Sequence, residues 1–117
     1  MKYLLLIVNA EADWERLSAQ EQQRVIDGMN KVDAELKGAG KFVSCGGLAP
    51  SSTAKTVRLT GGERSVIDGP AIQLKDNKHL VTGFFVIESG TIEEAVGWAK
   101  KLPIIAGAIE VRPIAME

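Results

Sequence analysis

Four apolar runs of strand length predict the strands of one sheet. Residues 2–8 and 83–87 are dense in Leu, Ile, Val and Phe, which is typical of strands covered on both faces. Residues 41–45 and 107–113 form two further runs, and in the last of them apolar and charged residues alternate. That alternation places the Ile and Val of the last run on the inner face of its strand.

Two segments have the period of an amphipathic helix, and each begins with a polar capping sequence. Ser18 and Glu21 fit a capping box, in which each side chain accepts a hydrogen bond from the backbone of the other residue. Gly38 and Gly40 are the stop signal of the helix that Ser18 and Glu21 open. A Thr-Ile-Glu-Glu sequence at 91–94 repeats the pattern before a shorter helix that Pro103 ends. The apolar stripe of the first helix consists of Val25, Ile26, Met29, Val32 and Leu36.

A β-hairpin is expected in the middle of the chain. Two strand-like runs, 55–60 and 63–67, flank a Gly-Gly pair, which is a hairpin signal. A tight Asp-Gly-Pro turn at 68–70 follows the hairpin, and we expect a loop from there to about Val81. Another loop is expected over residues 9–17.

The predicted order is strand, helix, strand, hairpin, strand, helix, strand. Without the hairpin the order is βαββαβ, the split arrangement of ferredoxin-like domains, and the class is α+β. The two helices would cover one face of an antiparallel sheet, and apolar side chains of residues 4–8 and 84–87 would remain on the other. A large exposed apolar patch usually marks an interface. The sequence therefore predicts a homodimer that packs sheet against sheet.

Composition and charge narrow the class of protein. A chain of 117 residues, 45% hydrophobic and 25% charged, is expected to fold as one domain over 1–117. The net charge of −1 is spread evenly, so the basic surface of a nucleic-acid-binding protein is missing. The first apolar run is too short to span a membrane, which takes about 20 residues, and it lacks the features of a signal peptide. We expect a cytoplasmic protein with no membrane partner.

One cysteine and one histidine limit the chemistry. An internal disulfide is impossible, and no cluster of metal ligands stands out, so neither a metal nor another cofactor is expected. Cys45 is expected to be a small buried apolar residue.

Asp68 is the main candidate for catalysis or ligand binding. It ends a β-branched strand, where Gly69 and Pro70 could fix its direction, so that its carboxylate acts as a general base or anchors a small-molecule ligand in a pocket. The alternative is that Asp68 only caps the tight turn through backbone amides, as Asp-Gly sequences often do.

Other polar residues are weaker candidates. His79 is the one side chain expected to titrate near neutral pH. It could act in catalysis, or it could be an ordinary solvated histidine in a loop. Lys75 and Arg112 could bind an anionic ligand, as could Arg58, although solvated or interfacial ion pairs are the commoner role.

Taken in order, motifs along nearly the whole chain resemble those of the YCII-related, or DGPF, domain family. They are Met1-Lys2-Tyr3-Leu4-Leu5-Leu6-Ile7, Gly46-Gly47-Leu48-Ala49-Pro50, Thr56-Val57-Arg58, Asp68-Gly69-Pro70, Gly83-Phe84-Phe85-Val86-Ile87, Glu93-Glu94-Ala95 with Trp98-Ala99, Leu102-Pro103 and Glu110-Val111-Arg112-Pro113-Ile114. The resemblance implies a dimeric α+β barrel. Some relatives look like small enzymes with a His–Asp pair, and others are encoded beside extracytoplasmic-function sigma factors.

The chain departs from the pattern of that family at two places. Ala71 replaces the phenylalanine of the Asp-Gly-Pro-Phe motif, and residues 20–24, where histidine-bearing relatives have their histidine, contain none. Two hypotheses follow. The first is a metal-independent small-molecule enzyme that uses Asp68, and the alternative is a non-catalytic ligand-binding or accessory, regulatory protein.

Overall fold

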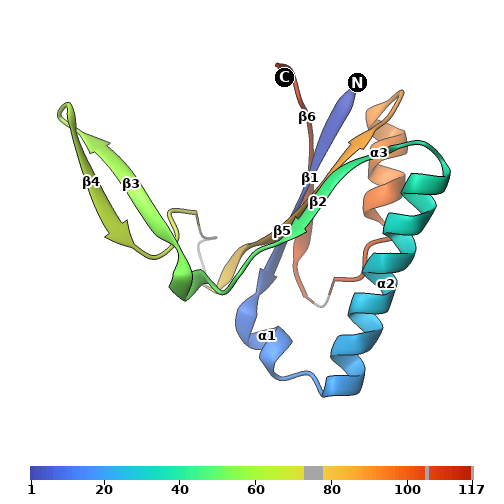
Figure 1. The fold of residues 1–117 in the computed structure, drawn as a ribbon, viewed down its shortest axis with the longest axis horizontal. Helices are drawn as coiled ribbons and strands as arrows, with labels where there is room; N and C mark the ends of the chain where they lie inside the picture. The colour runs from blue at the N-terminus through green and yellow to red at the C-terminus, as the bar shows by residue number, and fades with distance from the viewer. Residues whose placement is uncertain (73–77, 105, 117) are drawn as a thin grey trace.

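Four antiparallel strands form the main sheet of an α+β fold (Figure 1). They are β1 (Lys2–Ala10), β2 (Phe42–Gly47), β5 (His79–Glu88) and β6 (Ala108–Pro113). Their order across the sheet is β2-β5-β1-β6. The computed structural model describes residues 1–72, 78–104 and 106–116. The predicted α+β class is confirmed.

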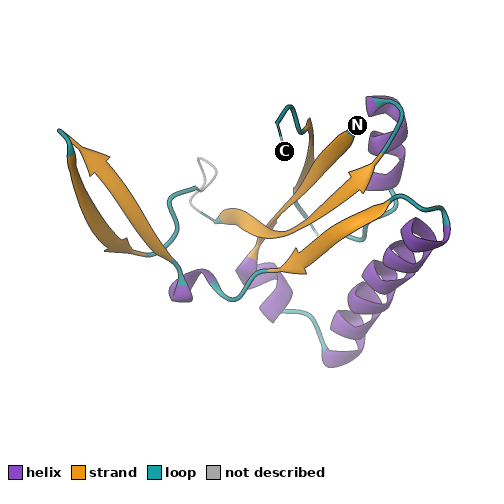
Figure 2. Cartoon of the chain, turned by 45° about the horizontal axis from the view of Figure 1, so that its top comes forward, coloured by secondary structure: helices purple, strands orange, loops and turns teal. Residues whose placement is uncertain are grey.

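Helices cover one face of this sheet (Figure 2). They are the long α2 (Ala19–Gly38) and the shorter α3 (Ile92–Ala99), while the single-turn helix α1 (Glu11–Glu15) directly follows β1. Helix α1 follows the end of β1, and α2 then runs back along the sheet (Figure 1).

The capping sequences place the helix starts where the sequence predicts them. Ser18 Oγ accepts a hydrogen bond from the Glu21 N–H, and the Glu21 side chain accepts one from the Ser18 N–H, which completes the capping box of α2. In α3, Thr91 Oγ1 accepts from the Glu94 N–H. The Glu94 carboxylate, however, accepts from the Gly90 N–H, so only half of the expected box forms there.

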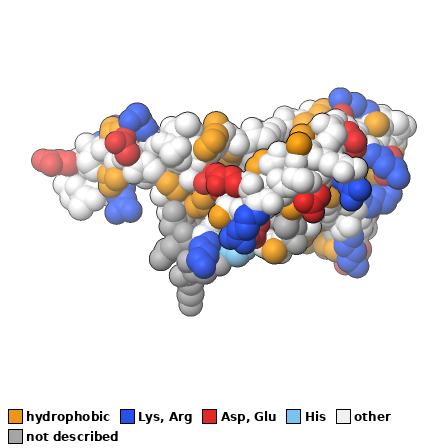
Figure 3. All heavy atoms as spheres, turned by 90° about the horizontal axis from the view of Figure 1, so that it is seen from below, with side chains coloured by type: hydrophobic (Ala, Val, Ile, Leu, Met, Phe, Trp, Pro, Cys, Tyr) orange, Lys and Arg blue, Asp and Glu red, His pale blue; other side chains and the backbone are white. Residues whose placement is uncertain are grey.

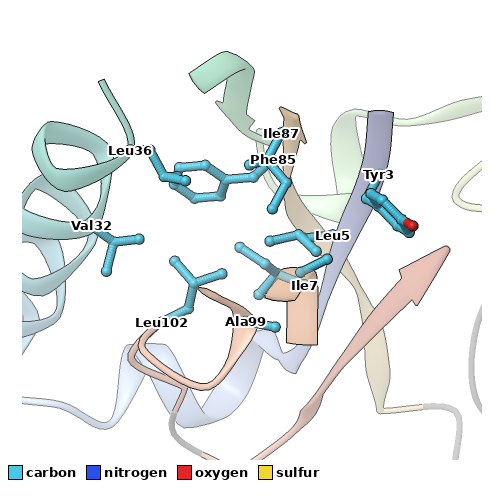
Figure 4. Close-up of a cluster of buried hydrophobic side chains, with 10 residues drawn as sticks. Tyr3, Leu5, Ile7, Val32, Leu36, Phe85, Ile87, Ala99 and Leu102 are labelled. Atoms are coloured by element: carbon cyan, nitrogen blue, oxygen red, sulfur yellow. The ribbon is translucent and has the colours of Figure 1, made fainter. Parts of the chain in front are cut away.

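The core lies between the sheet and the helices (Figure 4). Alternate residues of β1 and β5 point toward the helices, as a period of two requires. Leu5, Leu36 and Ile87 are the largest side chains that are fully buried, and each stabilises the fold by about 1.5–3 kcal/mol. Ile109 and Val111 of β6 pack against this cluster, as predicted. The buried set is Tyr3, Leu5, Ile7, Val32, Leu36, Phe85, Ile87, Ala95, Ala99 and Leu102.

The opposite face of the sheet is apolar but only half-buried. The residues of β1 and β5 that alternate with the core residues point to this open face. They include Leu4, Leu6, Phe84 and Val86, which are all half-buried. In the part of the chain that the structure describes, helices α2 and α3 lie on the other side of the sheet, so they leave this face without cover.

The predicted hairpin forms an arm that projects from the body of the protein (Figures 1 and 3). This arm consists of β3 (Lys55–Thr60) and β4 (Glu63–Asp68), with Lys55 opposite Asp68. Gly61 and Gly62 have φ angles of 58° and 86°, the left-handed conformation that tight hairpin turns require. Four large apolar side chains of the arm are 42–66% exposed, namely Val57, Leu59, Val66 and Ile67.

The projecting arm also accounts for the dimensions of the molecule. The Cα radius of gyration is 15.8 Å, whereas a compact domain of this length has one of about 13 Å. The strands of the arm pair with each other in a separate two-stranded sheet. An isolated two-stranded hairpin is marginally stable at best in water, so the pairing of β3 with β4 by itself stabilises the arm little.

Two expected loops are shorter than predicted. The loop expected over residues 9–17 is replaced by the end of β1 and by α1, and β5 already begins at His79 although the loop was expected to reach Val81. The cause is pairing between distant segments, because Asn9 lies opposite Leu80 and Ala10 opposite His79 in the β1–β5 ladder. The register of the ladder shifts at a bulge after Ile7, because Ile7 lies opposite Gly83 and Val8 lies opposite Val81. The pairing then continues to His79.

Candidate ligand-binding site

A cavity of about 500 Å³ lies between the sheet, α1 and the N-terminal half of α2. Its sheet side includes Ile7 and Phe85, and its helix side includes Trp14, Ile26 and Met29. The apolar stripe of α2 is therefore divided between two roles. In the C-terminal half Val32 is 4% exposed and part of the core, whereas in the N-terminal half Ile26 is 42% exposed and lines the cavity.

Glycines in the strands make room for this cavity. Gly46 and Gly47 end β2, Gly83 lies opposite Gly47 in β5, and all three line the cavity. A Cβ on Gly83 would approach the Gly46 carbonyl oxygen at 3.0 Å and a methyl group of Ile7 at 3.7 Å, on the helix-covered face of the sheet. Because Gly47 and Gly83 have no side chains on this face, the sheet there is flat below α2. A Cβ on Gly46 would instead lie 2.9 Å from the Phe84 ring, which is on the open face.

Polar groups gather at the end of the cavity where β1 passes into α1. The Glu11 carboxylate accepts two hydrogen bonds from Ser51, which belongs to the 3₁₀ turn η1 (Ser51–Thr53). The Ser51 N–H donates to Glu11 Oε2 at 2.7 Å, and the Ser51 hydroxyl donates to Glu11 Oε1. Nearby, Asn9 Nδ2 donates to Thr82 Oγ1 at 3.3 Å. Asn9, Glu11 and Thr82 all line the cavity, which therefore has an apolar body and a polar end.

A buried oxygen and a tight backbone contact lie beside this polar end. Asn9 Oδ1 is buried, and it has no hydrogen-bond partner among the described residues. It lies against Gly107, where a Cβ would be 2.8 Å from Oδ1 and only 1.9 Å from the Val8 carbonyl oxygen. The chain can enter β6 along this path only because residue 107 is a glycine.

Cys45 lines the cavity, but its surroundings keep it a thiol. It is exposed, so the expectation of a buried residue is wrong; β2 is an edge strand and leaves it uncovered. Partial burial and then the nearby Asp33 carboxylate raise the pKa of Cys45, and the Lys37 ammonium only partly offsets them. The Sγ atom lies 3.9 Å from Asp33 Oδ1. A cysteine with a raised pKa is a poor nucleophile at neutral pH.

Asp68 lies at the end of β4 in the arm and lines neither this cavity nor the second one described below. Its side chain is 85% exposed, and Lys55 Nζ lies 2.6 Å from its Oδ1. The turn after it is fixed by Gly69, which has φ 101° and whose N–H donates to the Ala54 carbonyl at 2.8 Å. Thr56 Oγ1 donates to the Gly69 carbonyl at 2.7 Å. These hydrogen bonds fix the direction of the backbone at the end of β4. A catalytic role for Asp68 stays a prediction.

Two other predicted site residues, His79 and Arg112, contact groups other than Asp68. His79 is the first residue of β5, and its Nε2–H donates to the Ala106 carbonyl at 2.8 Å. Arg112 is exposed on the edge strand β6 and pairs with Glu110. Lys75 lies outside the described residues. The roles proposed for these side chains also stay predictions.

A second cavity of about 640 Å³ lies on the other side of Glu11, between the open face of the sheet and the root of the arm. Leu6 lines it from the sheet, Lys55 from the arm, and Pro70 and Ile72 from the segment that follows the arm. Of the predicted turn residues, Pro70 thus contributes to a cavity wall. Glu11, Leu48, Pro50 and Thr82 line both cavities.

Sequence reasoning did not find the polar end of the first cavity. Glu11 and Trp14 fall in a segment that was expected to be a loop, and Ser51 lies 40 residues from its carboxylate partner. One usable signal was the pair of glycines that ends β2, because glycines in a strand mark close approach or missing side-chain volume.

The described residues form neither a metal-binding cluster nor a membrane-spanning helix. Within residues 1–72, 78–104 and 106–116, no group of at least three His, Cys, Asp or Glu side chains is arranged to hold a metal ion. No helix in the same ranges has the length and apolar character needed to cross a membrane.

The fold and cavity together define a class: an α+β protein whose antiparallel sheet has helices on one face and an apolar pocket beneath them. Comparison with known sequences identifies the family within this class. The model of the YCII-related domain matches residues 1–116. An uncharacterized protein of Rhizobium meliloti (strain 1021) is 32% identical over 119 residues, which cover 99% of this chain and 94% of that protein. The chain belongs to the YCII-related family.

Proposed function

We propose that the protein is a homodimer of ferredoxin-like subunits that binds an apolar small molecule in the cavity between α1, α2 and the sheet. The cavity carries this proposal. Its volume of about 500 Å³ lies within the range of small-molecule sites, roughly 300–1,000 Å³, and such sites combine an apolar lining with a few converging polar groups. The hydrogen-bonded Glu11 and Asn9 supply those groups.

The topology supports the ferredoxin-like description. When the arm, α1 and η1 are set aside, the remaining elements follow the order βαββαβ. The strand order β2-β5-β1-β6 places the first and third strands of that set in the centre of the sheet and the second and fourth at its edges.

Two apolar surfaces support the dimer. Leu4, Leu6, Phe84 and Val86 are half-buried on the open face of the sheet, and the arm exposes four further apolar side chains. A two-fold interface uses the same patch on both copies. One dimer could therefore cover the open sheet face and the arm of each copy. This arrangement agrees with a dimeric α+β barrel, in which the two open sheet faces meet.

Ligand binding is tested with N-phenyl-1-naphthylamine, a neutral dye that fluoresces in apolar pockets. Val25 lines the cavity and Ala34 is exposed on the same helix, so Val25→Trp and Ala34→Trp add the same ring inside and outside the cavity. We expect the wild type and Ala34→Trp to bind the dye with one saturable site and Val25→Trp to lose binding. Equal binding by both variants would place the dye elsewhere and refute the proposed site.

The hypothesis of an Asp68-dependent enzyme receives less support from the geometry, because Asp68 lines neither cavity of the single chain. It stays a prediction, as does the alternative of an accessory, regulatory protein. Binding of a small molecule in the cavity is compatible with either.

A further inference from the structure

We infer that the ligand of the first cavity is an organic cation, that is, an amine or a quaternary ammonium group on an apolar body. This inference rests on the proposed function and adds the chemical class of the ligand. Among the described residues, the lining of the cavity contains the carboxylates of Glu11 and Glu15 and no lysine, arginine or histidine. The wall therefore carries two negative charges that no basic lining residue neutralises.

Glu11 is oriented to receive a ligand. Both of its oxygens accept hydrogen bonds from Ser51, which fixes the plane of the carboxylate. A carboxylate has about four acceptor positions, so further positions remain for a donor from the ligand. Glu15 follows four residues later on the same helix, and residues with that spacing share one face. A positive group between them would interact with both.

Trp14 adds a second attraction for a cation. It lies between the two glutamates in the sequence, is half-buried and lines the same cavity. The face of an indole ring attracts ammonium groups, and aromatic walls are a common part of sites for quaternary ammonium. The cation–ring contacts found within the described residues are those of Lys37 with Phe42 and Lys101 with Trp98, so neither of these lysines uses the Trp14 ring.

The remaining walls show that the cation brings its own apolar body. Metal ions such as Ca²⁺ take six to eight oxygen ligands, and the described residues form no such cluster. Away from Glu11 the cavity is bounded by apolar side chains such as Ile26, Met29 and Phe85. A ligand that places its charge beside Glu11 would bury its hydrocarbon part against these three.

Three probes with one ring system and different charges test this inference by isothermal titration calorimetry: 1-naphthylmethylamine, 1-naphthylmethanol and 1-naphthoate. At neutral pH the first is a cation, the second neutral and the third an anion. We expect the amine to bind about tenfold more tightly than the alcohol, since charge-assisted hydrogen bonds are roughly twice as strong as neutral ones. We expect the carboxylate to bind more weakly than the alcohol.

Glu11→Gln keeps the size of the side chain and removes its charge, so this variant should bind the amine and the alcohol about equally. Glu93→Gln is the matched control, because Glu93 is exposed in the first turn of α3, away from the cavity, and it should retain the wild-type preference. An unchanged preference in Glu11→Gln would overturn the role of Glu11. If Glu11→Gln does not fold, Glu15→Gln and Trp14→Leu replace it; each should reduce the preference, and no reduction in either would overturn the inference.

The outcomes separate the inference from the proposed function. Binding of the alcohol at least as tightly as the amine would refute a cationic ligand while leaving the cavity as a ligand site. Failure of all three probes and of the neutral dye to bind would refute both.

Discussion

Replacing Gly28 by alanine should destabilise the protein, although alanine favours helices. Gly28 lies in the middle of α2, and a Cβ there would be 2.9 Å from Pro103 Cγ and 3.5 Å from Pro103 Cβ. The segment after α3 can therefore touch α2 only because residue 28 has no side chain. Pro103 also lines the first cavity, so this contact closes one of its walls.

The size of the effect follows from two opposing terms. Alanine gains about 1 kcal/mol over glycine in a helix interior. Against this, carbon atoms prefer separations of about 3.5–4.0 Å, so α2 and Pro103 must move apart by more than half an ångström, and such overpacking costs about 1–3 kcal/mol. We expect a net loss of about 1 kcal/mol in the free energy of unfolding, taking both ranges at their centres.

Gly97 in α3 provides the matched control. It is exposed, and a Cβ there would meet nothing within 4 Å, so Gly97→Ala should gain up to about 1 kcal/mol. Because one kcal/mol shifts the Tm of a domain of this size by about 4 °C, the two variants should differ by about 8 °C. Calorimetry at one fixed protein concentration measures this difference, since association shifts Tm. A Tm that rises equally in both variants would show that Pro103 does not limit α2, and would refute this reasoning.

Three further predictions concern backbone fit, pH and assembly. Gly107→Ala should lose more than about 2 kcal/mol, because its Cβ would lie 1.9 Å from the Val8 carbonyl oxygen; urea unfolding measures this, and wild-type stability would contradict the described path of β6. The pKa of Glu94 is lowered from its ordinary value of 4.5, first by the hydrogen bond from Lys41 and then by that from the Gly90 N–H. A lowered carboxyl pKa gives stability that is present above 4.5 and is lost as the pH falls through the folded-state value. Glu94→Gln should therefore weaken the fall of Tm with acid, and an unchanged Tm–pH profile would refute the role of this pair. Leu6→Arg should convert the proposed dimer to a monomer, measured by light scattering; a wild type that is already a monomer at micromolar concentration would refute the dimer.

Local signals predicted most of the secondary structure. The Ser18–Glu21 capping box and the Gly-Gly turn of the arm each depend on neighbouring residues only, and both form as expected. Long-range pairing was not visible in the sequence. Strand β5 begins at His79 because that residue pairs with Ala10, and no local pattern in either segment indicates this.

The candidate site was harder to predict for the same reason. The sequence drew attention to Asp68, whose strand-end turn is a strong local signal. The polar end of the cavity instead joins Glu11 to Ser51 across 40 residues. Gly28 shows the same difficulty within one helix: propensity alone marks it as a weak point, whereas contact with Pro103 gives it a packing role.

In the proposed dimer, the exposure of the arm would depend on protein concentration. A single chain carries four exposed apolar side chains on this hairpin, and the outer edges of its two strands are open to pairing with other chains. The same hairpin offers Arg58 and Arg64, both exposed, to trypsin. If the arm packs in the proposed dimer, cleavage at these arginines would slow as protein concentration rises. Arm cleavage would then report the fraction of chains that have not yet found a partner.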